Sequence, residues 1–233
     1  MSLAAIFFDL DGTLCAPTVP FDGVFGAVVA PLLQRRAGLT LDDLLRSWAA
    51  ALLKPGPATT AECFRALLNA CGSNPNDGIA DGLAAALNRR WAASQALAPG
   101  AKEALQRLGA SWPLGLITNG PSDAQRAVVD VLGISDSFRW LLVSGDADVG
   151  VRKPDPAIFA HAAQRAGCAP REALYVGDSA INDVAGAAAA GWYTCWLNPA
   201  ADDLPSSIPE PDLTMPRLDA LLGVLAAWPG AEP

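Results

Sequence analysis

The strongest constraint on the fold is an alternation of short apolar runs with helical patterns between residues 98 and 197. A further apolar run, at residues 4–8, has the character of a buried strand. Alternating strands and helices are typical of βαβ units, which build a parallel sheet. We therefore expect an α/β fold in which helices cover both faces of a Rossmann-like parallel sheet. The later strands are expected at Pro113–Thr118, Arg139–Ser144, Ala173–Gly177 and Tyr193–Leu197, and the helices at Pro99–Gly109, Ser122–Leu132, Pro156–Ala166 and Ala180–Ala190.

Two other stretches of the chain have different patterns. Helical patterns fill residues 20–96, and we expect no strand there. This predicts an all-helical segment inserted after the first strand. Residues 199–216 are loop-rich, with an edge strand expected at Asp212–Thr214 and a last amphipathic helix at Leu218–Trp228.

Composition and charge exclude several classes of protein. The 233 residues carry a net charge of -8, and 52% of them are hydrophobic. Such a chain can bury a sizeable core, which excludes wholesale disorder. An acidic chain lacks the clustered Lys and Arg that bind nucleic acids or anionic membranes. No apolar run is long enough to span a bilayer, and Asp9 and Asp11 interrupt the N-terminal apolar stretch, so we expect no secretory signal.

The cysteines and the one histidine exclude further kinds of site. Five cysteines without a CxxC pair argue against a disulfide framework or a zinc knuckle, and we expect reduced thiols in a cytoplasmic protein. His161 is the one histidine, and we expect it to have a surface or packing role on a helix. A Ser-His-Asp hydrolase would need it, yet no GxSxG follows a strand. A monomer and a homodimer are both compatible with the sequence.

Polar side chains follow four of the expected strands. In an open parallel sheet, the carboxyl ends of the strands form the ligand-binding edge. Carboxylates that converge there raise one another's pKa unless a cation lies among them, and oxygen ligands without His or Cys suit Mg²⁺. Carboxylates, Mg²⁺, a lysine and a threonine together form a site for phosphoryl transfer. The side chains concerned are Asp9 and Asp11, Thr118 and Asn119, Lys153, and Asp178 and Asp183.

Four short segments resemble the motifs of a known family. FDLDGTL at residues 8–14 resembles the first motif of the haloacid dehalogenase-like (HAD) superfamily, and ITNG at 117–120 resembles the second. KPDP at 153–156 and VGDSAIND at 176–183 are similar to the third and fourth motifs. The resemblance implies a C1-capped phosphatase of subfamily I. Its core domain would comprise residues 1–14 and 98–233, and its helical cap residues 15–97.

The resemblance also implies a reaction. Asp9 would be the nucleophile that forms an aspartyl-phosphate, and Asp11 would protonate the leaving oxygen and then activate water. Mg²⁺ would be held by Asp9, by the backbone carbonyl of Asp11 and by Asp178.

Other site residues follow from the same resemblance. Thr118 and Lys153 would bind the phosphoryl oxygens, and Asn119 would face the phosphate or the cap. Gly12 would allow the turn after the nucleophile, and Asp183 would be hydrogen-bonded to the site from behind. Alternative interpretations make Asn119 an ordinary turn residue and Asp183 an exposed helix residue.

These inferences point to a Mg²⁺-dependent phosphatase for a small phosphorylated metabolite, of the nucleoside monophosphate or phosphosugar type. A phosphomutase on the same fold is an alternative. A 2-haloacid dehalogenase is another, although it would need neither Asp11 nor the metal. A non-catalytic binding protein is more remote, because it would be expected to have lost an acidic residue of the site. We expect the tryptophans to be mostly core, with stacking of Trp48 or Trp91 on a substrate ring as the alternative.

Overall fold

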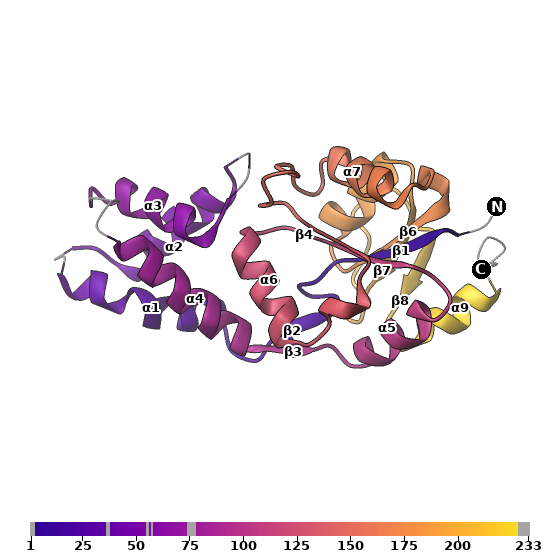
Figure 1. Ribbon diagram of the computed structural model, residues 1–233, viewed down its shortest axis with the longest axis horizontal. Coiled ribbons are helices and arrows are strands. Elements are labelled where there is room, and N and C mark those ends of the chain that lie inside the picture. Colours follow the sequence, from indigo (N-terminus) through magenta and orange to yellow (C-terminus); the bar gives the residue numbers. More distant parts are fainter. Residues whose placement is uncertain (1–2, 36–37, 55, 57, 74–77, 228–233) are drawn as a thin grey trace.

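A six-stranded parallel sheet forms the centre of the larger half of the molecule (Figure 1). The computed structural model describes residues 3–35, 38–54, 56, 58–73 and 78–227. The strand order is β5-β4-β1-β6-β7-β8, and every neighbouring pair is parallel. The expected α/β class is therefore confirmed. The strands are β1 (Ala5–Phe8), β4 (Leu114–Thr118), β5 (Trp140–Val143), β6 (Ala173–Gly177), β7 (Tyr193–Leu197) and β8 (Leu213–Met215).

Helices cover both faces of this sheet because successive side chains of each strand point to opposite faces. Ile6 and Phe8 of β1 belong to the apolar cluster that includes α5 (Ala101–Gly109), α6 (Ser122–Val131) and α9 (Leu221–Ala227). Phe7 belongs to the cluster on the other face, which includes α7 (Pro156–Ala166) and α8 (Gly186–Ala189). The strands are consequently buried on both sides, as their continuous apolar sequence predicts.

Four further helices lie together at one end of the molecule, at the left of Figure 1. They have an apolar cluster of their own, in which Phe25, Trp48 and Phe64 pack together. Capping boxes begin two of them, at Thr40 and Thr59. These helices are α1 (Phe21–Arg35), α2 (Leu41–Leu52), α3 (Thr60–Ala70) and α4 (Ile79–Ala93).

A two-stranded antiparallel ribbon joins the four helices to the sheet. It pairs β2 (Cys15–Pro17) with β3 (Gln95–Leu97). The expectation of no strand within residues 20–96 is therefore wrong at the end of that range, where β3 begins. Each strand has only three residues, without an alternating pattern, and its partner lies far away in the sequence. Such pairing leaves no local signal.

Two expected helices differ from the prediction. Residues 180–190 form a π-helical turn, η3 (Ala180–Ala185), followed by α8. The last helix is divided into a 3₁₀ turn, η4 (Leu218–Ala220), and α9, while the predicted end at Trp228 lies outside the described residues. Two more 3₁₀ turns are η1 (Ser135–Ser137) and η2 (Pro170–Glu172).

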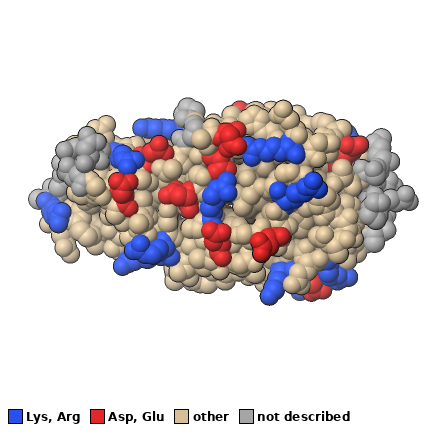
Figure 2. Space-filling model, viewed as in Figure 1, with Lys and Arg blue, Asp and Glu red and all other residues tan. Residues whose placement is uncertain are grey.

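Acidic and basic side chains are intermingled over the face shown in Figure 2. Among the described residues on this face, Lys and Arg form no extended basic surface of the kind that follows a nucleic-acid backbone. Within the described residues, none of the helices has both the length and the apolar character needed to cross a bilayer.

Candidate active site

The polar residues expected at the strand ends meet in one cavity of about 240 Å³. Asp9 follows β1, Thr118 ends β4, and Asp178 follows β6, so three neighbouring strands contribute. From β1, the strands follow one another to β4 and β5 on one side and to β6, β7 and β8 on the other. Open α/β sheets bind ligands at such a point, where the strand order reverses. The lining residues are Asp9, Asp11, Thr118, Asn119, Lys153, Asp178, Ser179, Asn182 and Asp183.

Lys153 is the charged centre of the buried part of the site. Its ammonium nitrogen lies 2.7 Å from Oδ1 of Asp9 and 2.7 Å from Oδ1 of Asp183. It also donates a hydrogen bond of 2.8 Å to the Tyr175 hydroxyl, which in turn donates to the carbonyl of Ile117. Burial lowers the pKa of Lys153, but the two carboxylates outweigh this and raise it, so the lysine stays charged.

Asp183 is buried, with 1% of its surface exposed, so it is not an exposed helix residue. One of its oxygens accepts from Lys153 and the other from the backbone N–H of Ser179, at 2.9 Å. Gly177 makes room for it, because a Cβ at Gly177 would overlap the Asp183 side chain. Its carboxylate therefore fixes the lysine and the loop that carries Asp178. The hydroxyl of Ser179 accepts from Asn182 N–H and caps η3.

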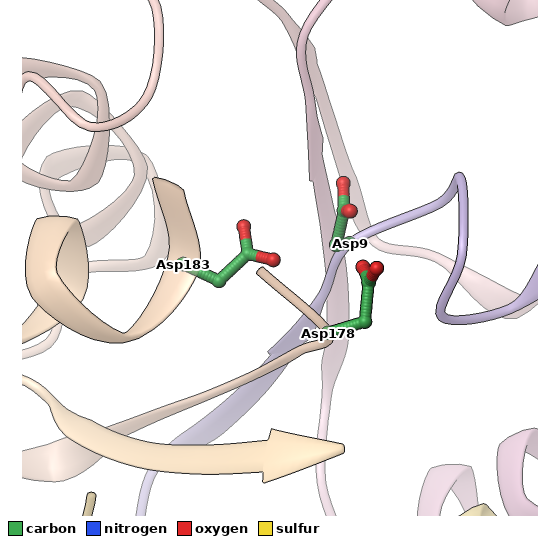
Figure 3. Close-up of side chains that lie close together, drawn as sticks. All are labelled: Asp9, Asp178 and Asp183. Carbon is green, nitrogen blue, oxygen red and sulfur yellow. The ribbon is translucent and has the colours of Figure 1, made fainter. Parts of the chain in front are cut away.

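Three carboxylates face a common space (Figure 3). Asp9, Asp178 and Asp183 each place an oxygen within 4.8 Å of the others. Burial is the largest cause that raises the pKa of both Asp9 and Asp178, and the negative charge of Asp183 raises both further. A divalent cation would relieve this repulsion, and an all-oxygen donor set suits a hard cation. The residues present therefore fit a metal ion.

Asp11 lines the same cavity but is not one of the three clustered carboxylates. Its Oδ2 accepts a hydrogen bond of 3.0 Å from the side-chain amide of Gln125 on α6. Burial raises the pKa of Asp11, and the bond from Gln125 opposes that rise. The Gln125 amide also donates to the carbonyl of Asn119, and its oxygen accepts from the Thr118 hydroxyl at 3.4 Å. The sequence did not single out Gln125, because a glutamine on a helix has no distinguishing pattern.

Asn119 joins two of the motifs. Its side chain accepts from the backbone N–H of Lys153 and donates to the carbonyl of Lys153, both at 2.9 Å. Asn119 is therefore more than a turn residue, since it fixes the loop that carries the lysine.

The loop after β1 is held against Asp178. Gly12 has a φ of 83°, and a Cβ built there would overlap the Asp178 carboxylate. The Thr13 hydroxyl donates to Oδ1 of Asp178 at 3.1 Å, and the Trp196 indole donates to the Asp178 carbonyl at 2.8 Å. Thr13 lies within the first motif, although its sequence alone gave no role for it.

The comparisons with known proteins agree with this architecture. The model of the haloacid dehalogenase-like hydrolases matches residues 3–191, and the chain belongs to that family. The solved structure of a 2-haloacid dehalogenase from Pseudomonas syringae pv. Tomato DC3000 superposes with a TM-score of 0.78 at 26% identity, covering 97% of this chain and 99% of that one.

Several curated relatives are phosphatases. Pyrimidine 5′-nucleotidase YjjG of Escherichia coli (strain K12) is 38% identical over 53% of this chain and 54% of its own length. A phosphoserine phosphatase of Thermus thermophilus is 42% identical over 36% of this chain, and that match spans only 33% of the relative. A phosphoglycolate phosphatase of Pseudomonas putida is 30% identical over 93% of this chain and 78% of its own length. The first two matches thus span between a third and about half of each relative.

Proposed function

We propose that this chain is a Mg²⁺-dependent phosphatase that hydrolyses a small phosphorylated metabolite, of the nucleoside monophosphate or phosphosugar type, through an aspartyl-phosphate. The observation that carries the proposal is the Asp9 carboxylate, which faces the acidic cavity while Lys153 holds one of its oxygens at 2.7 Å. The names of the phosphatase relatives point the same way.

In the first step, a carboxylate oxygen of Asp9 attacks phosphorus in line. The new bond joins that oxygen to phosphorus, the ester P–O bond breaks, and Asp11 gives its proton to the leaving oxygen. The raised pKa of Asp11 suits a group that must hold a proton before this step. In the second step, Asp11 accepts a proton from water, which attacks the phosphorus and releases inorganic phosphate from Asp9.

Asp9, the backbone carbonyl of Asp11 and Asp178 would hold Mg²⁺, with Asp183 hydrogen-bonded behind them. When bound, Mg²⁺ supplies positive charge that offsets the charge on the phosphoryl oxygens. Lys153 contributes a second positive charge beside Asp9, and the Thr118 hydroxyl lines the same cavity. Both would bind phosphoryl oxygens, and Asn119 would keep the Lys153 loop in place.

We also propose the division into an α/β core, residues 1–14 and 98–233, and a helical cap, residues 15–97. The separate apolar cluster of α1–α4 and the narrow β2–β3 ribbon support it. The five cysteines are free thiols, which supports a cytoplasmic location. We propose further that the chain is a monomer or a homodimer.

The alternatives fit the site less well. A haloacid dehalogenase needs a nucleophile, but it has no use for the partly buried Asp11–Gln125 pair or for an acidic cluster that fits a metal. A phosphomutase would share the whole site and would differ in how long the phosphorylated enzyme is kept from water.

Hydrolysis of acetyl phosphate and p-nitrophenyl phosphate by the purified chain tests the proposal. We expect release of inorganic phosphate with Mg²⁺ and none after EDTA, with recovery when Mg²⁺ is restored. Chloride release from 2-chloropropionate that persists in EDTA would instead establish the dehalogenase. Transfer of phosphate to a second metabolite without net hydrolysis would establish the mutase.

A further inference from the structure

A second and larger chamber, of about 550 Å³, lies between the four helices and the core. Phe21 of α1, Trp48 of α2 and Trp91 of α4 line it from the helical side, together with leucines of α2 and α4. The core contributes the 119–121 loop and α6. Its volume lies in the range of small-molecule sites.

Aromatic rings dominate one wall of this chamber. The Phe21 and Trp48 rings are stacked with centroids 6.3 Å apart, and the Trp91 ring meets Phe21 edge-on at 5.2 Å. Phe21 and Trp91 are only half-buried, so part of each ring is left for another partner. Rings arranged in this way present π-faces and edges that favour a planar ligand.

The chamber adjoins the acidic cavity, because Asp11 and Asn119 line both. A phosphoryl group beside Asp9 would therefore direct its leaving group past Asp11 into the chamber.

The lining of the chamber is mostly uncharged. Of the described residues that line it, Asp11 and Arg152 are the charged ones. Asp11 repels an anion, and the Arg152 guanidinium keeps its charge while one of its N–H groups donates to the carbonyl of Leu52. Apart from Arg152, nothing in the described part of the lining would compensate a carboxylate in the leaving group for the water that it loses, whereas an uncharged ring fits the apolar wall.

The walls of the chamber are fixed to one another by a partly buried polar cluster. Asp123 of α6 accepts from the Thr60 N–H at 2.7 Å and from the Asn88 amide at 2.8 Å. The backbone of Ala58 also pairs with Gly145 and Ser122 of the core. The chamber therefore exists before a ligand binds, which lowers the entropy lost on binding.

We infer that the chamber receives an uncharged aromatic ring, and that the substrates are phosphate esters of alcohols that carry such a ring, as nucleoside 5′-monophosphates do. This rests on the proposed function and narrows it: phosphosugars without a ring of this kind, and phosphoglycolate, are poorer substrates. Stacking on Trp91 distinguishes the two groups.

Matched substrates test the inference. Adenosine and uridine 5′-monophosphates and ribose 5-phosphate are all primary alkyl esters, and they differ in the base. We expect kcat/KM to be about tenfold or more higher for the nucleotides, the size of one base stacked on a side chain. A ratio near one, or a preference for phosphoglycolate, would overturn the inference while leaving Mg²⁺-dependent hydrolysis of acetyl phosphate intact. Loss of acetyl phosphate hydrolysis would instead count against the proposed function.

Variants of Trp91 test whether the preference for nucleotides arises in the chamber. Trp91→Ala should lower kcat/KM for the nucleotides about tenfold and for ribose 5-phosphate less than twofold, and Trp91→Phe should restore most of the difference. Val131→Ala, at an exposed position on α6, is the matched control and should change neither. Equal losses for both substrates in Trp91→Ala would mean a merely structural tryptophan and would overturn the assignment.

A binding measurement keeps the inference testable if turnover fails. Isothermal titration of the Asp9→Asn variant should give tighter binding of adenosine 5′-monophosphate than of ribose 5-phosphate, by about tenfold. Equal affinities would reject the aromatic subsite.

Discussion

The ammonium nitrogen of Lys153 lies 2.7 Å from Oδ1 of Asp9, although the two residues are separated by the whole helical segment and two strands of the sheet. Only 3% of Lys153 and 7% of Asp9 is exposed. The lysine thus holds the candidate nucleophile in place and offsets part of its charge.

Replacing this lysine should destabilise the protein. Lys153→Met would leave Asp9 and Asp183 buried without their cation, and breaking a buried ion pair in this way costs about 3–5 kcal/mol of unfolding free energy. Urea denaturation with EDTA present measures the loss, and hydrolysis of acetyl phosphate should fall in parallel. Lys102→Met, at an exposed position on α5, is the matched control. Equal unfolding midpoints for the two variants would contradict the stabilising role of Lys153.

Asp9→Asn tests the nucleophile. The amide is a poor nucleophile of almost the same size, so the fold should persist while turnover falls by about 10³-fold or more. Circular dichroism and phosphate release measure the two effects. Asp136→Asn, an exposed residue in η1, should retain full activity. Substantial turnover by Asp9→Asn would remove Asp9 from the mechanism.

Gln125 should tune the proton transfers of Asp11. Its hydrogen bond favours the charged carboxylate, so Gln125→Leu should raise the pKa of Asp11. The limb of the kcat profile that requires ionised Asp11 should then move to higher pH, and Gln125→Glu should move it further, because a second negative charge adds to the effect. A uniform fall in kcat at every pH, without a shifted limb, would mean that Gln125 acts only in packing.

A comparison of Gly12→Ala with Gly133→Ala distinguishes the cost of backbone strain from damage to the site. Gly12 and Gly133 both have positive φ, at 83° and 65°, so alanine should cost each of them about 1 kcal/mol of stability. A Cβ at Gly12 would also overlap the Asp178 carboxylate, whereas a Cβ at Gly133 meets nothing within 4 Å. We expect Gly12→Ala to lose Mg²⁺-dependent activity and Gly133→Ala to keep it. Similar activities would show that Asp178 tolerates displacement.

Mg²⁺ should stabilise the protein in a pH-dependent way. The pKa values of Asp9 and Asp178 are raised, mainly by burial, so the folded state binds their protons more tightly than the unfolded chain does. Without metal, the contribution of these groups to stability is therefore lost as the pH rises above their unfolded pKa of about 4. Mg²⁺ binds the ionised carboxylates, so the stabilisation that it gives should increase as the pH rises.

Thermal unfolding measures this effect. At a Mg²⁺ concentration about 100 times Kd, the gain is about 2.7 kcal/mol, which raises Tm by roughly 5–10 °C. The shift should be larger at neutral pH than at acidic pH. An equal shift in Asp178→Asn would place the ion elsewhere.

Many residues of the candidate site could be predicted to lie together from the sequence, because they follow apolar strands in short segments. Asp9, Thr118 and Asp178 are examples, and parallel strands bring their carboxyl ends to one edge. Gln125 and Tyr175 could not be predicted in this way, because they meet the site from a helix and from the middle of a strand. Their chemistry depends on which way a side chain points, and that is decided by packing between distant segments.

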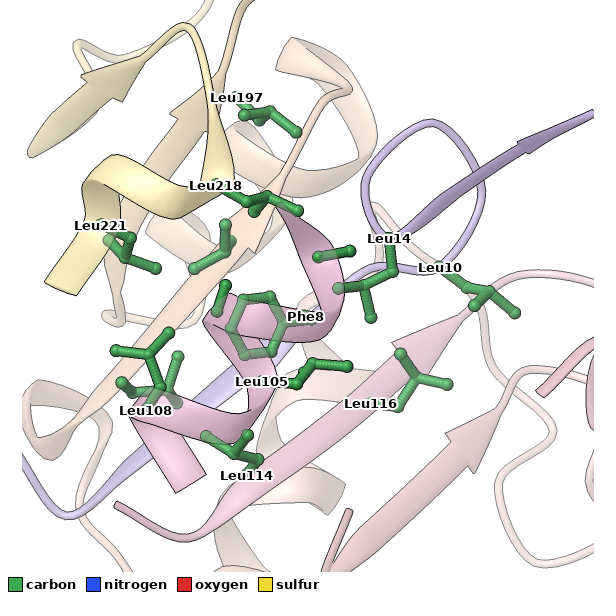
Figure 4. Packing of buried hydrophobic residues seen from close by; sticks show 14 of the residues in the cluster. Phe8, Leu10, Leu14, Leu105, Leu108, Leu114, Leu116, Leu197, Leu218 and Leu221 are labelled. Carbon is green, nitrogen blue, oxygen red and sulfur yellow. The ribbon is translucent and has the colours of Figure 1, made fainter. Parts of the chain in front are cut away.

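The apolar pattern by itself determined the layers of the core. Phe8, Leu105 and Leu116 pack together because each lies on the buried face of its own strand or helix, and burial of apolar surface drives that arrangement (Figure 4). Only the tertiary structure decided the β2–β3 ribbon, the Gln125–Asp11 bond and the aromatic chamber beside it. Each of these depends on pairing or distance between segments far apart in the chain, and local periodicity carries no information about such distances.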